Sequence, residues 1–124
     1  MTKKIIVLGH VLIRGVITTS EKLIEKNMDE EITIGRQSGT DIGWVFSWIS
    51  RKHGRIFLEK GIFNEHLDYE DYSSFGTTVL HWNKHNNGVE TEFVHNKKVK
   101  IKPGDWLILC KEGKEGVVMQ VLVK

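Results

Sequence analysis

The sequence predicts an all-β fold, a two-sheet antiparallel β-sandwich with at most one short helix in a loop. Short runs rich in Ile, Val, Leu, Trp and Thr recur along the 124 residues, and clusters of Gly, Asn, Asp and Ser separate them. Residues 31–35 (EITIG) alternate polar and apolar side chains, and residues 117–123 (VVMQVLV) do so more loosely. Such alternation is typical of strands with one face on a core and the other in water.

The apolar runs predict a series of short strands. They cover residues 4–8, 11–14, 31–35, 43–46, 54–59, 64–68, 78–82, 89–94, 98–101, 105–110 and 116–123. One segment fits a short helix instead: around residues 19–28 (TSEKLIEKNM), Thr18 and Glu21 have the spacing of a capping box. Turn-forming residues occur at 83–88 (NKHNNG) and 102–105 (KPGD), and we expect a hairpin tip at each.

Length and composition predict a single domain over residues 1–124. The apolar runs are too short to span a membrane, and the N-terminal residues MTKKIIVLGH lack the features of a secretory signal, so we expect a cytoplasmic protein. The single cysteine, Cys110, cannot form an internal disulfide and is expected to be buried. A formal net charge of +2 is too small to predict nucleic-acid binding, so any anion site must be local.

Three polar clusters interrupt the predicted strands. They are residues 34–41 (IGRQSGTD), 49–56 (ISRKHGRI) and 71–78 (DYSSFGTT), and each falls at a strand end or in a loop. Loops at one end of a rigid sandwich are common recognition sites. Together the clusters offer guanidinium groups and hydroxyls with few carboxylates nearby. This combination suits a phosphate group, which carries about −1.5 to −2 charge and three acceptor oxygens.

The order and spacing of these motifs resemble the forkhead-associated (FHA) family, whose members are β-sandwich modules that bind phosphothreonine peptides. The resemblance spans residues 31–123, with the core motifs within 31–110, and implies an FHA/SMAD-like sandwich. The matching residues are Gly35, Arg36, Asp41, Ser50, Arg51, His53, Ile56, Asp71, Ser73, Gly76, Thr77, Gly104 and Asp105.

The resemblance implies a phosphopeptide site made of Arg36, Ser50, Arg51, Ser73, Ser74 and Phe75. In it, Arg36 contacts the phosphate or the adjacent peptide backbone, Ser50 donates its hydroxyl to a phosphate oxygen, and Arg51 supplies a second charge. Ser74 contacts the phosphate or lines the pocket for the threonine methyl group. The implied structural members are Gly35, His53, Gly76 and Thr77, and His53 ties the recognition loops together without touching the ligand.

Two positions depart from the family pattern. Phe75 stands where the usual Asn hydrogen-bonds the ligand backbone, and a phenyl ring cannot form those bonds. Leu80 stands where a second Asn is common. We therefore expect weaker clamping of the peptide backbone, by about 1 kcal/mol for each missing net hydrogen bond.

The expected function is recognition of phosphothreonine in a protein partner, as a signalling adaptor without enzymatic activity, cofactor or metal. Nucleic-acid and membrane partners are not expected, and a monomer is the default state. The alternative is a phosphate-independent interaction module that uses the aromatic residues of segment 43–48 (GWVFSW). Trp44, Phe46 and Trp48 share one parity, so we expect one or two of these rings to remain exposed as an apolar platform.

Simpler interpretations exist for several of these residues. Arg36 is also placed to pair with Asp41 on the surface. A solvated basic rim, without a role in recognition, would also explain Arg51, Lys52 and Arg55. A metal site at His81 and His85 is disfavoured, because their spacing brings two rings together on a helix and not on a strand running into a turn. Catalysis by a Ser50–His53 pair is disfavoured, because residues three apart on an extended segment point to opposite faces.

Overall fold

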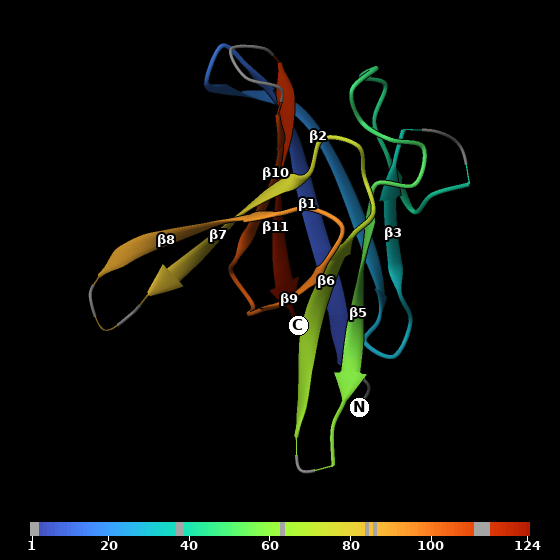
Figure 1. The fold of residues 1–124 in the computed structure, drawn as a ribbon, viewed down its shortest axis with the longest axis vertical. Helices are drawn as coiled ribbons and strands as arrows, with labels where there is room; N and C mark the ends of the chain where they lie inside the picture. The colour runs from blue at the N-terminus through green and yellow to red at the C-terminus, as the bar shows by residue number, and fades with distance from the viewer. Residues whose placement is uncertain (1–2, 37–38, 63, 84, 86, 111–114) are drawn as a thin grey trace.

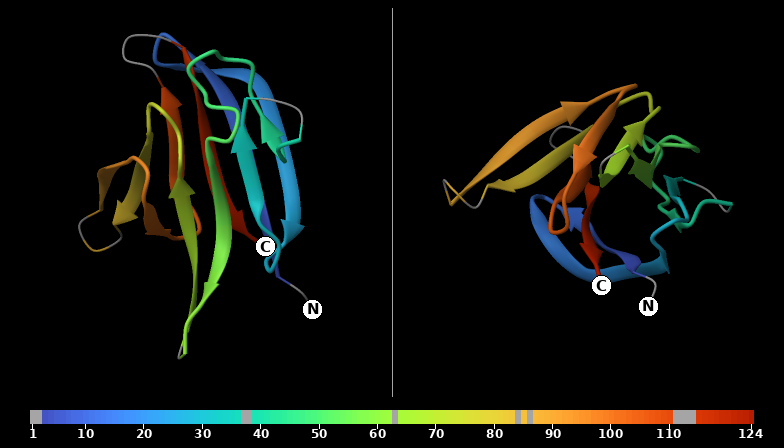
Figure 2. Two further views of the ribbon diagram at one scale, coloured as in Figure 1. Left: turned by 45° about the vertical axis from the view of Figure 1, so that its right-hand side comes forward. Right: turned by 90° about the horizontal axis from the view of Figure 1, so that it is seen from below.

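The computed structural model describes residues 3–36, 39–62, 64–83, 85, 87–110 and 115–124, with backbone alone for Ser20 and Cys110. These residues form two β-sheets stacked as a sandwich, and no helix occurs among them (Figures 1 and 2). Accordingly, the described part of the chain contains no helix that could span a membrane. The predicted all-β sandwich is confirmed.

The first sheet has six strands, and all of its neighbouring strands run antiparallel. In spatial order they are β2 (Val16–Asn27), β1 (Lys4–Ile13), β11 (Gly116–Val123), β10 (Trp106–Cys110), β7 (Thr77–Asn83) and β8 (Gly88–Val94). The second sheet has five strands, of which β3 and β4 form the one parallel pair. In spatial order they are β4 (Ile42–Gly43), β3 (Ile32–Gly35), β5 (Gly54–Lys60), β6 (Glu65–Asp71) and β9 (Lys98–Ile101).

The core lies between the two sheets and is built from alternate residues of their strands. In β1 the inward Ile5 and Val7 are fully buried and the residues beside them are partly or fully exposed, and in β3 Ile32 and Ile34 are fully buried with Thr33 partly exposed between them. Burying one such aliphatic side chain contributes roughly 1.5–3 kcal/mol. The largest buried side chains include Ile5, Ile32, Ile34, Ile56, Tyr69, Leu107 and Met119. This core fixes the strand ends from which the polar loops emerge.

The predicted helix at residues 19–28 is wrong, because residues 19–27 lie in β2. It pairs with β1 along most of its length, for example Leu23 with Leu8 and Glu25 with Ile6. The preceding residues explain the pairing. Arg14 and Gly15 both have positive φ, 50° and 78°, which is the backbone of a two-residue type I′ hairpin turn. The hairpin brings β2 back along β1, so pairing across the turn overrides a local capping pattern.

One of the two expected hairpin tips is confirmed. Residues 83–88 join β7 to β8, and Asn83 pairs with Gly88 at the end of that ladder. Residues 102–105 join two different sheets, since β9 pairs with β6 while β10 pairs with β7 and β11. Gly104 has a φ of 97°, a conformation that glycine adopts without strain. The turn chemistry at 102–105 therefore marks a crossover and not a hairpin.

Candidate functional site

The three polar clusters lie together at one end of the sandwich, at the upper right of Figure 1. Backbone hydrogen bonds join them: the N–H of Arg36 donates to the carbonyl of Ser50 at 3.0 Å, and the N–H of His53 donates to that of Ile34 at 2.9 Å. On the other side, the N–H of Tyr72 donates to the carbonyl of His53 at 3.0 Å. Residues 50–53 of the second cluster are thus hydrogen-bonded to the first cluster on one side and to the third cluster on the other.

Gly35 allows the first two clusters to approach each other. A Cβ atom at this position would overlap the backbone carbonyl of Arg51. Since that contact is with backbone, no side-chain rotation relieves it. A glycine here is therefore a condition for placing Arg36 beside segment 50–53, in agreement with the structural role implied for Gly35.

His53 braces the site from inside, with 1% of its surface exposed. Its Nδ1 accepts a hydrogen bond from the backbone N–H of Ser50 at 3.2 Å. The proton of the neutral ring therefore lies on Nε2, which donates to the carbonyl of Gly76 at 3.1 Å and lies 3.2 Å from Thr77 Oγ1. Thus one imidazole links the second and third clusters and fixes the backbone of Ser50.

The environment keeps His53 neutral. Burial, which disfavours the imidazolium ion, lowers the pKa of His53 below its ordinary value. The carboxylate of Asp71 and the carbonyl of Gly76 oppose that shift without reversing it. A proton added at Nδ1 would face the N–H of Ser50, so the loop geometry depends on the neutral ring.

A buried hydroxyl network supports the third cluster. Asp71 accepts hydrogen bonds from Thr77 Oγ1 at 2.8 Å and from the backbone N–H of Asn96 at 3.1 Å. Tyr69 donates its hydroxyl to Thr77 Oγ1 at 2.7 Å. Burial raises the pKa of the Tyr69 phenol well above its ordinary value, so this donor keeps its proton. The sequence pattern matched Asp71 without giving it a role, and it did not single out Tyr69; the structure shows that both support the site.

Ser73 belongs to this network and differs from the ligand contact that the sequence predicts. Its side chain is buried, with 3% of the residue exposed, and its hydroxyl donates to Asp71. The same oxygen accepts the N–H of Gly76 at 2.7 Å. A Ser73 hydroxyl engaged on both sides shapes the turn before Gly76, whose φ is 84°, and is not available to a ligand.

Ser50 and Ser74 form the neutral part of the candidate site. The backbone N–H of Ser74 donates to Ser50 Oγ at 3.0 Å, which joins the second cluster to the third. Because Ser50 Oγ accepts this bond, its own proton is left to donate to an anion. Ser50 is half-buried and Ser74 is exposed, so both face the solvent side of the loops.

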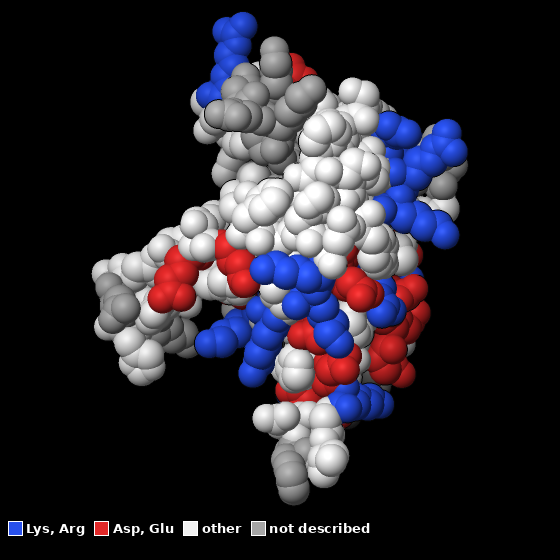
Figure 3. All heavy atoms as spheres, viewed as in Figure 1, with Lys and Arg blue, Asp and Glu red and all other residues white. Residues whose placement is uncertain are grey.

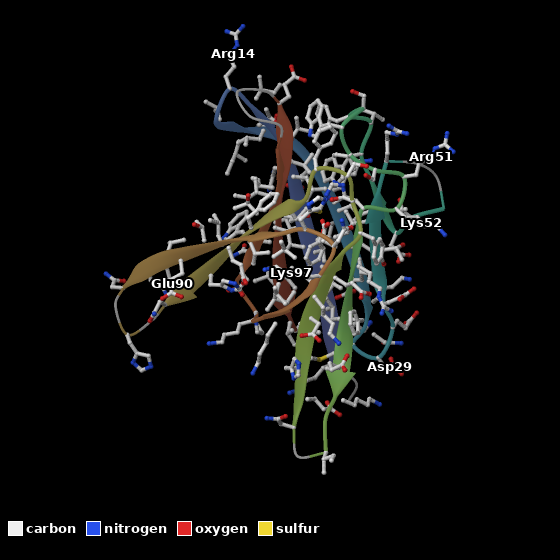
Figure 4. All side chains as sticks on the ribbon, in the orientation of Figure 1. Arg14, Asp29, Arg51, Lys52, Glu90 and Lys97 are labelled. Atoms are coloured by element: carbon white, nitrogen blue, oxygen red, sulfur yellow. The ribbon has the colours of Figure 1, made fainter. Side chains whose placement is uncertain are left out.

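The cations lie around these hydroxyls. Arg36 Nη1 donates to the carbonyl of Ser47 at 2.8 Å, which uses one of its five N–H donors and orients the guanidinium. Arg51 and Lys52 are exposed and extend from the loop into solvent (Figure 4). Within the described chain, no carboxylate lies within ion-pair distance of any of these three side chains. Their positive charge therefore remains available to an anionic ligand.

Asp41 does not neutralise Arg36. Its carboxylate instead pairs with Lys26 Nζ at 2.8 Å and accepts hydrogen bonds from the N–H and hydroxyl of Thr33. Burial favours the neutral acid, but the bonds from Lys26 and Thr33 outweigh it and hold the pKa of Asp41 below its ordinary value. The surface pair of Arg36 with Asp41 is thus absent, and Asp41 ties β3 to β2.

Arg55 is not part of a basic rim. Its guanidinium donates to Glu31 and to Glu70, each at 2.9 Å, and lies over the ring of Phe57 at 4.0 Å from the centroid. These contacts place it on the outer face of the five-stranded sheet. The rim is confined to Arg51 and Lys52.

Segment 43–48 is irregular beyond the end of β4 at Gly43, so the strand expected at 43–46 extends only over Ile42–Gly43. Trp44 is buried, whereas Phe46 and Trp48 are half-buried and stack with ring centroids 4.7 Å apart. Val45 is 90% exposed. An apolar surface beside the site therefore exists, but it consists of Val45 with parts of two rings.

Phe75 lies at the tip of the third cluster with 54% of its surface exposed. The phenyl ring offers apolar area there in place of an amide. A small cavity of about 190 Å³ adjoins the other side of the site, with Lys52, Tyr72 and Thr33 in its lining.

Two further predictions concern histidines. The Nδ1 of His53 faces the backbone N–H of Ser50 and not its hydroxyl, so the structure contains no nucleophile–base contact between these residues.

His81 lies 2.8 Å from the buried carboxylate of Asp105, in the wall of an open groove of about 750 Å³. His85 also lines this groove, which lies between the β7–β8 hairpin and residues 102–105, apart from the polar loops. Among the described residues, no group of three His, Cys, Asp or Glu side chains could hold a metal ion.

No family model and no curated protein sequence matches the chain. Solved structures do match it. An FHA domain from Arabidopsis thaliana is 21% identical, with 98% of this chain and 86% of that chain covered and a TM-score of 0.66. Yeast Pml1p is 19% identical over 97% and 83% of the two chains, with a TM-score of 0.66. The MEK1 FHA domain in complex with a threonine-phosphorylated HOP1 peptide is 13% identical over 94% and 96%, with a TM-score of 0.59.

These similarities extend over nearly the whole chain, at identities that establish the fold alone. The protein has the fold of a forkhead-associated (FHA) domain.

Proposed function

We propose that this protein binds phosphopeptides and recognises phosphothreonine in a protein partner, as an intracellular signalling adaptor without catalytic activity. The observation that carries the proposal is the convergence of Ser50, Ser74 and Arg36 at one end of the sandwich, with Arg51 beside them. The Ser50 hydroxyl retains a proton to donate, and no described carboxylate neutralises the two arginines. The MEK1 structure with a phosphorylated peptide supports the proposal by analogy of fold.

Charge-assisted hydrogen bonds supply the expected affinity. Two or three such bonds to the phosphate are each worth about 1.5–3 kcal/mol before the costs of desolvation and ordering. Because the structural members of the site hold Ser50 and Arg36 in place, little ordering remains to be done on binding. The threonine methyl group is expected to contact Ser74, so phosphoserine binds less tightly.

The test compares threonine-phosphorylated peptide pools with their unphosphorylated counterparts by titration calorimetry or fluorescence anisotropy. We expect phosphorylation to strengthen binding at least about tenfold, as one charge-assisted bond alone would give. Arg36→Ala should remove most of that difference. The matched control is Arg14→Asn, which removes an exposed arginine from the β1–β2 turn, well apart from Arg51 and Lys52 (Figure 4).

Equal affinity for the phosphorylated and unphosphorylated pools would overturn the proposal. It would favour the second candidate, a phosphate-independent interaction module, which rests on the exposure of Val45 beside the half-buried Phe46 and Trp48. In that case Val45→Asp would weaken partner binding while Arg36→Ala would not.

A further inference from the structure

The outer face of the six-stranded sheet is unusually apolar. Antiparallel sheets that face water on one side carry polar residues there. In this sheet, residues directly opposite each other form two rows that cross all six strands. The first row is Leu23, Leu8, Gln120, Trp106, Leu80 and Thr91, and the second is Glu21, His10, Val118, Ile108, Thr78 and Phe93.

These rows point away from the core, because their neighbours along each strand are core residues such as Val7, Leu107, Val79 and Met119. Of the twelve side chains, Glu21 alone belongs to the Asp, Glu, Lys and Arg types, and it lies on the edge strand β2. Beyond the rows, Trp82 and Val89 face each other across β7 and β8, and each is at least half exposed. We call this surface the apolar face.

The other sheet shows the ordinary pattern. Its outward row consists of Thr33, Arg55, Glu70 and Lys98, and a second row contains Phe57, Asp68 and Lys100. Acidic and basic side chains alternate over β5, β6 and β9, as Figure 3 shows. Several form ion pairs, including Arg55 with Glu31 and Glu70. The contrast shows that the apolar face is a property of one sheet and not of the whole surface.

No described element covers the apolar face. The described strands form two layers, so each sheet has one face toward the core and one without a third layer over it (Figure 2). Leu23 is 65% exposed on β2, and Phe93 is 59% exposed on β8, at the opposite edge. Between these edges Leu8, Leu80, Trp106 and Ile108 are half-buried and Val118 is 5% exposed, so the exposed apolar area of the face is largest near its two edges.

The area of the face matches a protein interface. Six strands about 4.8 Å apart span about 25 Å, and eight paired residues at about 3.3 Å each extend about 25 Å along β1 and β11. The projected area is at most about 600 Å², because the ladders of β10 with β11 and with β7 are shorter, with five and three pairs. This equals the upper limit of about 300–600 Å² for the largest patch on typical monomers. It approaches the roughly 800 Å² that each partner buries in a standard interface.

We propose that a second copy of this chain covers the apolar face, giving a two-fold symmetric dimer in which the two six-stranded sheets pack face to face. The same surface on both subunits satisfies an isologous interface, and two apolar sheet faces pack in the manner of a β-sandwich core. Ten of the twelve rowed side chains come from β1, β11, β10, β7 and β8 and include no Asp, Glu, Lys or Arg, so self-association at neutral pH brings no like charges together there.

The proposal goes beyond phosphopeptide recognition and does not depend on it. The candidate phosphate site is formed by loops at the end of the sandwich and adjoins the apolar face at Phe93, whose ring lies beside Gly76. Leu23, on the edge strand β2, lies at the opposite edge of the six-stranded sheet. A variant that no longer dimerises should therefore still bind phosphopeptide at the candidate phosphate site of each chain.

Gln120 offers a sharp test because it lies near the middle of the first row, where a two-fold axis brings the two copies of the residue close together. Gln120→Glu is nearly isosteric and places two carboxylates in the dry centre of the interface. It also removes the bond from Gln120 Nε2 to the carbonyl of Gly104 at 3.3 Å, so the stability of this variant is measured by urea unfolding alongside its association. Leu23→Arg adds a charge at an exposed position on β2, where the monomer loses no core contact. The matched control is Ile62→Arg, because Ile62 is 93% exposed between β5 and β6, off the apolar face.

The measurement is sedimentation equilibrium of the full chain over a range of micromolar concentrations, with the folded state checked by circular dichroism. We expect twice the monomer mass of 14.3 kDa for the unmodified chain and for Ile62→Arg. For Gln120→Glu and Leu23→Arg, we expect the dimer dissociation constant to rise at least about 100-fold with the β spectrum unchanged. A chain that is monomeric throughout overturns the proposal and assigns the face to a different protein. A dimer that both substitutions leave intact overturns it as well.

Discussion

At the residue scale, one buried histidine governs the geometry of the candidate site. His53 accepts the N–H of Ser50 and donates to the carbonyl of Gly76, so it joins the two loops that present Ser50 and Ser74. Protonation would turn the acceptor nitrogen into a donor that faces another donor. Stability and site geometry therefore depend on the same unprotonated nitrogen.

This arrangement predicts acid sensitivity. Burial lowers the pKa of His53 in the folded state, so as pH falls the unfolded chain takes up the proton first, near its ordinary pKa of about 6.5. The stability contributed by neutral His53 is complete above about pH 6.5 and is lost as pH falls from there through the folded-state pKa. We expect the urea midpoint to fall as the pH drops below about 6.5.

The matched variant for this test is His53→Gln, whose amide keeps a donor and an acceptor and does not titrate. It should be less stable than the unmodified chain at pH 7.5 and should lose less stability on acidification. Parallel pH profiles for the two proteins would show that other groups cause the acid sensitivity.

Phe75 is the residue at which this site departs most from the family pattern. Because its side chain is half exposed, replacing it alters the site with little effect on the core. Phe75→Asn supplies the amide that the FHA sequence pattern has at this position, where it would bond the peptide backbone. We expect phosphopeptide affinity to rise about fivefold, the equivalent of about 1 kcal/mol for one net hydrogen bond.

The titration that measures this gain is repeated with the unphosphorylated peptide and with Phe75→Ala. The alanine variant should not gain affinity, because it removes the ring without adding an amide. If Phe75→Asn binds more weakly than the unmodified chain, the ring itself contacts the ligand.

At the element scale, the β1–β2 hairpin shows how a turn decides secondary structure. The segment after Thr18 contains a capping pattern, yet the turn at Arg14 and Gly15 directs it back along β1. Apolar residues on both strands then pair, including Leu8 with Leu23 and Val7 with Ile24. Partners across a hairpin outweigh a local helical signal worth about 1 kcal/mol.

The turn carries a cost that one substitution should relieve. Arg14 has a φ of 50°, which is unfavourable for a residue with a Cβ, whereas Asn tolerates this region and Asn-Gly is the preferred type I′ pair. We expect Arg14→Asn to stabilise the protein by about 0.5–1 kcal/mol in urea unfolding. Arg14→Lys keeps the charge and the backbone penalty and should leave stability unchanged. Equal stability of all three proteins would mean that the turn carries no strain.

At the scale of the whole molecule, the loops and the outer faces of the two sheets present surfaces of different chemical character. The ends of the strands carry the cations and hydroxyls, the five-stranded sheet presents a charged outer face, and the six-stranded sheet presents an apolar one. The proposed recognition site lies at the loops and the proposed dimer interface on a sheet face, and the two adjoin where the ring of Phe93 lies beside Gly76.

The sequence by itself determined the sandwich class, most of the strands and the residues of the three polar clusters. Strand alternation, turn residues and motif spacing are local properties, and they survive folding because neighbouring residues enforce them. The sequence also contains the near-continuous apolar runs of β1 and β10, but these runs do not by themselves indicate that the outer face of the sheet is apolar.

The tertiary structure alone decided where those local pieces meet. It buried Ser73 while leaving Ser74 exposed, because the hydroxyl of Ser73 is held by Asp71 and Gly76. It paired Asp41 with Lys26, so Arg36 has no carboxylate partner among the described residues. It also aligned the outward residues of six strands into one apolar face. These outcomes depend on contacts between residues far apart in the sequence, and no local pattern encodes which distant partner a side chain will find.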